Sequence, residues 1–218
     1  DGDLDLAVSG TDPTFKRNTR IYGNNSGAFV QAASLTGLGN SALDWADYDS
    51  DGRLDMAVCG MDDNGVGTTR IYRNAATGFV SVGALTGLLS GDVAWGDLDG
   101  DGDPDLVVNG RDAASTRRSI AYENRGDSFV DFGFGLLGLD YGAAAIADFD
   151  GDLDLVLFLP GSPDGSTRER RLYSNQGSSP NTPPLPLGRV SASVIGNAVT
   201  FEWTAGLDAE TPTIGLSY

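Results

Sequence analysis

The chain has 218 residues and a net charge of −17, and it contains no histidine and a single cysteine. A charge of this sign argues against binding nucleic acid, whose phosphates require a lysine and arginine surface, and against binding an anionic membrane. The lack of histidine excludes Ser-His and Cys-His triads and imidazole-bound zinc, and one cysteine excludes an intrachain disulfide.

The sequence repeats with a period of about 50 residues, starting in its first segment, residues 1–40. The opening run, Asp1 to Asp5, matches Asp51 to Asp55 of the next copy. Other positions that recur at this step are Gly10, Gly60 and Gly110; Tyr22, Tyr72 and Tyr122; Asn24, Asn74 and Asn124; Phe29, Phe79 and Phe129; and Trp45 and Trp95. We divide the repeats into units 1–40, 41–90, 91–141 and 142–178.

Each unit has the pattern of a small β-sheet. In the second unit, short β-branched and aromatic runs at 54–58, 69–72 and 78–82 are separated by turn clusters at 62–65 and 76–78. Such runs predict strands joined by hairpins, and no stretch shows sustained helical periodicity. Four short strands in about fifty residues is the size of one propeller blade. We therefore predict an all-β fold, a partial propeller of about three and a half blades, with the repeated tryptophans and tyrosines between blades.

An aspartate loop of the form D-x-D-x-D-G-x-x-D opens the second and the third unit, at residues 47–55 and 97–105. The carboxylates repel one another, since two unit charges 4 Å apart cost about 4 kcal/mol at an effective dielectric near 20. A bound cation would remove this cost, and Ca²⁺ accepts irregular sets of oxygen ligands. Gly52 and Gly102 supply the backbone freedom for a tight reversal. We therefore predict calcium as the cofactor.

The residues after the loop distinguish it from an EF-hand. An EF-hand needs a bidentate glutamate at position 12 and a helix on each side. Position 12 is Val58 in the first loop and Val108 in the second, and both lie within apolar runs of strand character. The fourth carboxylate comes instead at position 9, directly before a predicted strand.

The fourth unit carries a damaged copy of the loop. It reads Asp148-Phe149-Asp150-Gly151-Asp152-Leu153-Asp154, two residues short if Gly151 is the turn glycine. Read without a gap, Leu153 replaces the glycine and Val156 the last carboxylate. Asp148, Asp150, Asp152 and Asp154 are candidate ligands, but we expect this site to bind metal less well than the other two.

The run from Trp95 to Val108 resembles the VCBS/FG-GAP repeat, which builds the β-propeller of integrin α subunits and of many secreted bacterial surface proteins. The resemblance covers residues 1 to about 178. It implies that calcium is coordinated by the carboxylates at positions 1, 3, 5 and 9 and by the main-chain oxygen at position 7. In the first loop these residues are Asp47, Asp49, Asp51, Arg53 and Asp55. In the second loop they are Asp97, Asp99, Asp101, Asp103 and Asp105.

A change of composition comes after the repeats. Residues 179–187 form a proline-rich linker. Alternating runs at 190–194 and 198–203, around Gly196 and Asn197, predict a hairpin. This hairpin resembles the first two strands of a fibronectin type III domain, with Trp203 as its core tryptophan, and we assign residues 188–218 to the start of such a domain. A sandwich of this kind needs about 100 residues, so we expect a fragment of a larger modular protein.

The expected function is non-enzymatic: a calcium-stabilised module of a secreted or cell-surface protein that binds a protein or carbohydrate ligand. The alternatives are an accessory part of a secreted carbohydrate-active enzyme and a rigid spacer. We expect the ions to fold the blades rather than to bridge a ligand. Ligand binding is expected at the loops 11–18, 61–67, 111–118 and 162–170, because repeated positions maintain a scaffold whereas its loops diverge.

Overall fold

The computed structural model describes residues 4–126, 128–149, 155–174, 190–195 and 198–203. Every regular element in these ranges is a β-strand. Within the same ranges no helix exists that is long and apolar enough to cross a membrane. The predicted all-β class is confirmed.

Four antiparallel sheets follow one another along the chain, and strands that are consecutive in sequence are neighbours in each sheet. The first sheet contains β1 (Leu6–Thr11), β2 (Arg17–Asn25) and β3 (Ala28–Leu35). The second contains β4 (Gly39–Ala46), β5 (Asp55–Met61), β6 (Gly67–Ala75) and β7 (Gly78–Ala84). The third contains β8 (Val93–Gly96), β9 (Asp105–Arg111), β10 (Arg117–Asn124) and β11 (Phe129–Asp131). The fourth contains β12 (Ala145–Ala147), β13 (Val156–Gly161) and β14 (Glu169–Tyr173).

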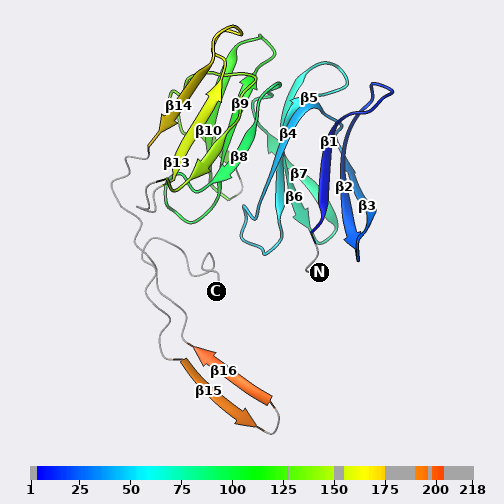
Figure 1. The fold of residues 1–218 in the computed structure, drawn as a ribbon, viewed down its shortest axis with the longest axis vertical. Helices are drawn as coiled ribbons and strands as arrows, with labels where there is room; N and C mark the ends of the chain where they lie inside the picture. The colour runs from blue at the N-terminus through cyan, green and yellow to red at the C-terminus, as the bar shows by residue number, and fades with distance from the viewer. Residues whose placement is uncertain (1–3, 127, 150–154, 175–189, 196–197, 204–218) are drawn as a thin grey trace.

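The sheets stand side by side as the blades of a partial propeller, from β1–β3 at one side to β13 and β14 at the other (Figure 1). We call them blades one to four in chain order. Strand β4 lies against β1 and β8, and β8 lies against β12, so the first strand of each blade contacts its neighbours. Because β1 corresponds by sequence to β5 and β9, the described part of blade one contains the last three strands of the pattern, and that of blade four the first three.

Blades two and three pack on both faces of their sheets, because successive side chains of a strand point to opposite faces. In blade two, Met56, Val58 and Tyr72 pack against blade one. Residues Ala57, Cys59 and Ile71 on the other face pack against Leu106, Val108 and Tyr122 of blade three. We call the face at the positions of Met56, Val58 and Tyr72 the leading face, and the face at the positions of Ala57 and Ile71 the trailing face. Each interface in the arc thus joins a trailing face to the leading face of the next blade.

A short linker closes each interface. The leucine directly after the linker glycine, Leu38, Leu88 or Leu139, is fully buried against the leading face of the next blade. The N–H groups of Thr36, Thr86 and Leu137 donate to the hydroxyls of Tyr72, Tyr122 and Tyr173 over 3.3, 3.2 and 3.0 Å. Tyr72 and Tyr122 are therefore inter-blade residues, as predicted, and Tyr173 is their counterpart in blade four.

The linker glycine is required by close approach to the blade that precedes it. A Cβ placed on Gly37, Gly87 or Gly138 would lie 2.1 Å from the carbonyl oxygen of Arg17, Gly67 or Arg117, the first residue of β2, β6 or β10. Real Cβ atoms essentially never come so close to another heavy atom. The Leu-Thr-Gly-Leu sequence is thus explained by two buried contacts and one position without space for a side chain.

The tryptophans also lie between blades, which confirms the prediction. Trp95 stacks on Tyr48 of blade two with ring centroids 6.0 Å apart, and it contacts Phe129 edge-on. Its indole N–H donates to the carbonyl oxygen of Asp44 over 3.3 Å. Trp45 makes an edge contact with Phe79. Both rings are thus partly buried in packing contacts.

The predicted C-terminal hairpin is present. Strands β15 (Val190–Ile195) and β16 (Ala198–Trp203) pair in antiparallel fashion, with Val190 opposite Trp203. The linker 179–187 and the turn residues Gly196 and Asn197 lie outside the described residues.

Candidate metal centre

The two complete aspartate loops connect the first and second strands of their blades, β4 to β5 and β8 to β9. Each reverses the chain within eight residues. The glycine at position 6 has a positive φ, 84° for Gly52 and 94° for Gly102. Only glycine adopts this region without a steric cost, as the sequence predicted. The following strand begins at the position 9 aspartate.

The first loop brings three of its four carboxylates together. Oxygens of Asp47, Asp49 and Asp51 all lie within 4.8 Å of one another. The carboxylate of Asp47 accepts the N–H groups of Asp51 and Gly52, over 3.0 and 2.8 Å. Oδ1 of Asp49 is buried and has no hydrogen-bond partner. A buried, unsatisfied anionic oxygen beside two other carboxylates fits a cation, because an unpaired buried charge is costly.

Arg53 contributes a side chain whose role the sequence did not reveal. Its guanidinium forms an ion pair with Asp51 and also donates to the carbonyl oxygen of Asn74. The family resemblance implies a role only for the main-chain oxygen of Arg53. This internal cation partly neutralises the first loop.

The second loop collects a different set of carboxylates. Oxygens of Asp97, Asp99 and Asp105 lie within 4.8 Å of one another. Asp97 accepts the N–H groups of Gly100 and Gly102, over 2.7 and 2.9 Å. Asp101 is outside this cluster and accepts the N–H of Asp103 over 3.1 Å.

No arginine is present in the second loop, whose position 7 is Asp103. Oδ1 of Asp103 is buried and has no hydrogen-bond partner. The second loop therefore carries five aspartates without an internal cation. A bound cation would relieve more repulsion between carboxylates in this loop than in the first.

The aspartate at position 9 has a structural role in addition to its place among the candidate ligands. Asp55 and Asp105 are fully buried. Asp105 accepts the N–H groups of Leu98 and Asn124, each over 2.8 Å. Asp55 accepts those of Tyr48 and Asn74 over 3.3 and 2.7 Å, and Asp5 in blade one accepts that of Asn24 over 2.9 Å. These are main-chain N–H groups, and the side chain gives the reason for an asparagine: Nδ2 of Asn24 and of Asn124 donates to the carbonyl oxygen before the aspartate, and Oδ1 accepts a backbone N–H of the following turn.

The electrostatics of both loops indicate uncompensated negative charge. Burial, together with the carboxylates of Asp49 and Asp51, raises the pKa of Asp55 to about 6. Burial, followed by repulsion from neighbouring aspartates, raises the pKa of Asp103 and of Asp105 to about 7. The pKa values of Asp97 and Asp99 are also raised, chiefly by burial. A cation in the loop would act in the opposite direction on each pKa.

The loop of blade four falls mostly outside the described residues. Asp148 follows β12 and is exposed. Asp150, Asp152 and Asp154 belong to the range 150–154, which the structure does not describe. The prediction for this loop stays a prediction.

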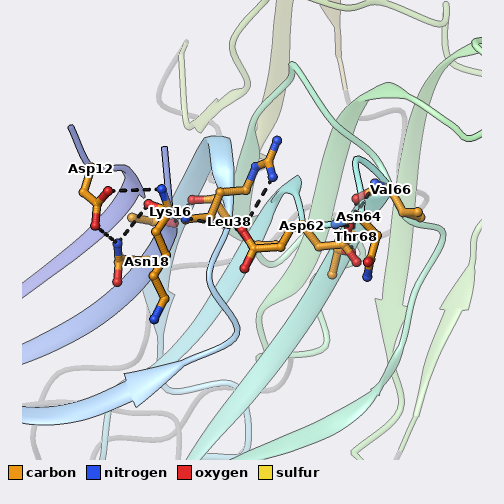
Figure 2. Close-up of polar contacts among 11 residues, drawn as sticks. Asp12, Lys16, Asn18, Leu38, Asp62, Asn64, Val66 and Thr68 are labelled. Carbon is orange, nitrogen blue, oxygen red and sulfur yellow. Dashed lines mark hydrogen bonds and ion pairs between the residues drawn. The ribbon is translucent and has the colours of Figure 1, made fainter. Parts of the chain in front are cut away.

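The loops proposed for ligand binding are hairpins on a shared backbone scaffold. Asp62 accepts the N–H groups of Asn64 and Val66, both over 2.9 Å, and Figure 2 shows this turn beside the equivalent turn at Asp12. The Asp12 carboxylate accepts the N–H groups of Thr14 and Lys16 over 2.9 and 3.1 Å. Asp112 accepts those of Ala114 and Thr116, both over 2.9 Å.

The first residue of each hairpin is therefore part of the scaffold, and the expectation that the whole loop varies was too broad. The signal was present, because Asp12, Asp62 and Asp112 recur at 50 residues. Adjacent hairpins also touch, since Nη1 of Arg17 lies 3.5 Å from Oδ1 of Asp63. The residues that differ between the three hairpins are 13–16, 63–66 and 113–116.

Comparison with known families agrees with this repeat. Residues 1–58 and 47–108 each match the FG-GAP-like repeat. No curated protein shows significant similarity to the chain. The matched residues end before the C-terminal hairpin, so they do not support the fibronectin type III assignment. The two matches overlap at 47–58, the first complete aspartate loop and the strand after it, and together they span blade one, blade two and the loop of blade three. The chain therefore carries FG-GAP-like repeats across its first 108 residues.

Proposed function

We propose that this chain is a calcium-binding propeller module that acts outside the cell or at its surface and binds a protein or glycan ligand on one rim. The observation that carries the metal part is the pair of carboxylate clusters, Asp47, Asp49 and Asp51 in one loop and Asp97, Asp99 and Asp105 in the other. The unsatisfied, buried Oδ1 of Asp49 supports a cation at the first cluster.

The donor chemistry favours calcium over transition metals. Every candidate side-chain ligand is a carboxylate, and hard oxygen donors suit Ca²⁺ or Mg²⁺, whereas zinc and copper prefer nitrogen and sulfur. The ligands come from an irregular loop, which suits calcium better than the strict octahedron of magnesium. Backbone N–H groups hold Asp97 and Asp105 in place, so these residues are oriented before any ion arrives. When bound, the ion would supply charge neutralisation and would fix the loop.

The metal loops and the proposed ligand rim lie at opposite ends of the same strands. Strand β5 begins at Asp55, in the aspartate loop, and ends at Met61, beside the hairpin anchored by Asp62. Seven residues of strand span roughly 20 Å. We therefore assign the ion a structural role and the hairpins a binding role. Calcium sites of extracellular modules bind with Kd around 10⁻⁴ to 10⁻³ M, which matches a location outside the cell.

A loop exchange tests the binding part of the proposal. Residues 113–116 are replaced by the sequence of 63–66, with the anchor Asp112 kept, and binding is measured on a glycan array and on a panel of extracellular matrix proteins. The proposal predicts altered ligand choice and unchanged calcium-dependent melting. Asp97→Ala is the matched control, which should lower melting in calcium. Turnover of a bound polysaccharide by the unmodified chain would instead favour a carbohydrate-active enzyme, and loss of folding after the exchange would show that the hairpin is structural.

A further inference from the structure

The tip of the hairpin between β1 and β2 carries Phe15, which is 86% exposed. This exposure follows from the place of the residue in the hairpin. Gly65 and Ser115 occupy the same position in blades two and three, which have a neighbour on each side, and both are also exposed. A Cβ built on Gly65 would meet no heavy atom within 4 Å. A side chain at this position therefore extends into open space in an interior blade as well.

The backbone of Phe15 is in a conformation that disfavours phenylalanine. Its φ is 64°, and φ is 78° at Gly65 and 61° at Ser115, so all three hairpins use the left-handed region at this position. This region is strained for residues with a Cβ, and most of all for bulky ones. Single exposed apolar residues are common on protein surfaces, but here the ring gains no burial that would offset the strain. The fold alone favours glycine at this position, so the reason for a phenylalanine lies outside the fold.

Hydrogen bonds within the hairpin hold the backbone of this tip in place. The Asp12 carboxylate accepts the N–H groups of Thr14 and Lys16, over 2.9 and 3.1 Å. The carbonyl oxygen of Asp12 accepts the Phe15 N–H over 2.9 Å. Asn18 joins the base of the turn, since its Nδ2 donates to the Asp12 carboxylate over 3.1 Å (Figure 2). Because the backbone is ordered beforehand, little conformational entropy would be lost when another molecule buries the ring.

The only lysine of the chain, Lys16, directly follows the exposed ring. It is exposed, and within the part of the chain that the structure describes its ammonium group forms no ion pair. The next residue differs, because Arg17 pairs with Asp63 of the neighbouring hairpin. The tip therefore presents an apolar ring and an unpaired cation side by side. This combination is complementary to an apolar pocket with a carboxylate at its edge.

We propose that Phe15 and Lys16 anchor a protein partner: the ring enters an apolar pocket of that protein, and the ammonium group pairs with a carboxylate at the edge of the pocket. The inference rests on the proposed function, since it assigns a protein to the rim described above. Aromatic residues that fill a pocket carry much of the binding energy of protein interfaces. A glycan is less suited, because small ligands are held in concave sites with converging polar groups, whereas this ring projects from a hairpin tip.

Thermal melting and capture by immobilised extracellular matrix proteins, with a glycan array in parallel, test the proposal on the 218-residue chain in calcium. Phe15→Gly should raise Tm by about 1–3 °C, because it removes the strained conformation, and should weaken protein capture about tenfold or more. Ser26→Gly is the matched control. Ser26 also has a positive φ, 54°, but it follows the other end of β2, so the variant should raise Tm similarly and leave capture unchanged. Phe15→Tyr should retain capture, and Lys16→Glu should weaken it, more at low salt than at high salt.

A higher Tm together with weaker capture in Phe15→Gly would support the proposal, because the ring would then serve binding at the expense of stability. Unchanged protein capture by this variant would overturn the inference and leave the proposed function intact, and so would binding of the unmodified chain to glycans alone. A lower Tm in Phe15→Gly would also overturn the inference, since the ring would then stabilise the fold. If the unmodified chain bound neither proteins nor glycans, the binding part of the proposed function would fail as well.

Discussion

Leu88→Ala is the most direct test of how the blades are joined. Leu88 is fully buried and packs in one cluster with Ile71 of its own blade and with Val108 and Tyr122 of the next. The substitution keeps the backbone contacts of this position, in which its N–H donates to the Thr69 hydroxyl and its carbonyl accepts the Gly60 N–H. Only the buried side chain is removed, which in protein cores costs about 2–5 kcal/mol.

The loss in the free energy of unfolding is measured by urea unfolding monitored with tryptophan fluorescence, because Trp95 packs at the edge of the same cluster. In a chain of this size 1 kcal/mol corresponds to about 2–4 °C in Tm, so a loss of about 3 kcal/mol lowers Tm by about 6–12 °C. The equivalent Leu38→Ala should give a similar loss at its own interface. Val66→Ala, on an exposed hairpin, should stay within about 0.5 kcal/mol.

A loss below about 1 kcal/mol for Leu88→Ala would refute the reasoning. It would mean that the linker leucine does not hold the leading face of blade three.

Further predictions concern the linker glycine and the electrostatics of the loops. Gly87→Ala should lower the free energy of unfolding by about 1–3 kcal/mol, because the new Cβ would lie 2.1 Å from the Gly67 carbonyl oxygen. Thermal melting measures this loss, and an unchanged Tm would show that the linker moves freely. Without calcium, Tm should rise as the pH falls from about 8 to about 5, because the raised pKa values of Asp103 and Asp105 make the folded chain bind protons that the unfolded chain does not. This stabilisation is present at low pH and is lost as the pH rises through about 7. Excess calcium should reverse the slope of Tm against pH. A Tm that does not change with pH in the absence of calcium would contradict the loop electrostatics. Arg53→Gln should lower Tm in EDTA more than in calcium, because its guanidinium neutralises Asp51 only where no ion does so; equal losses in both buffers would argue against that role.

The repeat made the inter-blade contacts predictable. Tyr72 and Trp95 recur because each blade buries the same positions against its neighbours, so their period indicates a core role without a structure. The aspartate loops were predictable for the same reason. Carboxylates that gather in one short loop, and a glycine that must adopt a positive φ, leave a fixed spacing in the sequence.

Other features required the fold. The side chain of Arg53 occurs in one loop only, so no period marked it. An aspartate recurs at the position of Asp12, but the residues after it differ between the hairpins. Its role in forming the turn was therefore not evident from the sequence. The exposure of Val8 could not be derived from a pattern shared with Val58, because burial depends on which blade lies next to it. A sequence repeat reveals the contacts that all blades share. The burial of residues at the ends of the arc and the roles of residues that occur once depend on which parts of the structure lie next to them.

The central claim, that the aspartate loops hold calcium, is tested most directly by calorimetric titration of the EDTA-stripped chain with Ca²⁺. The account predicts two binding events that reside in the loops of blades two and three. Asp49→Ala should remove one event and Asp99→Ala the other, each with a lower Tm in calcium. Binding heat that is absent, or that persists unchanged when both aspartates are replaced, would contradict it.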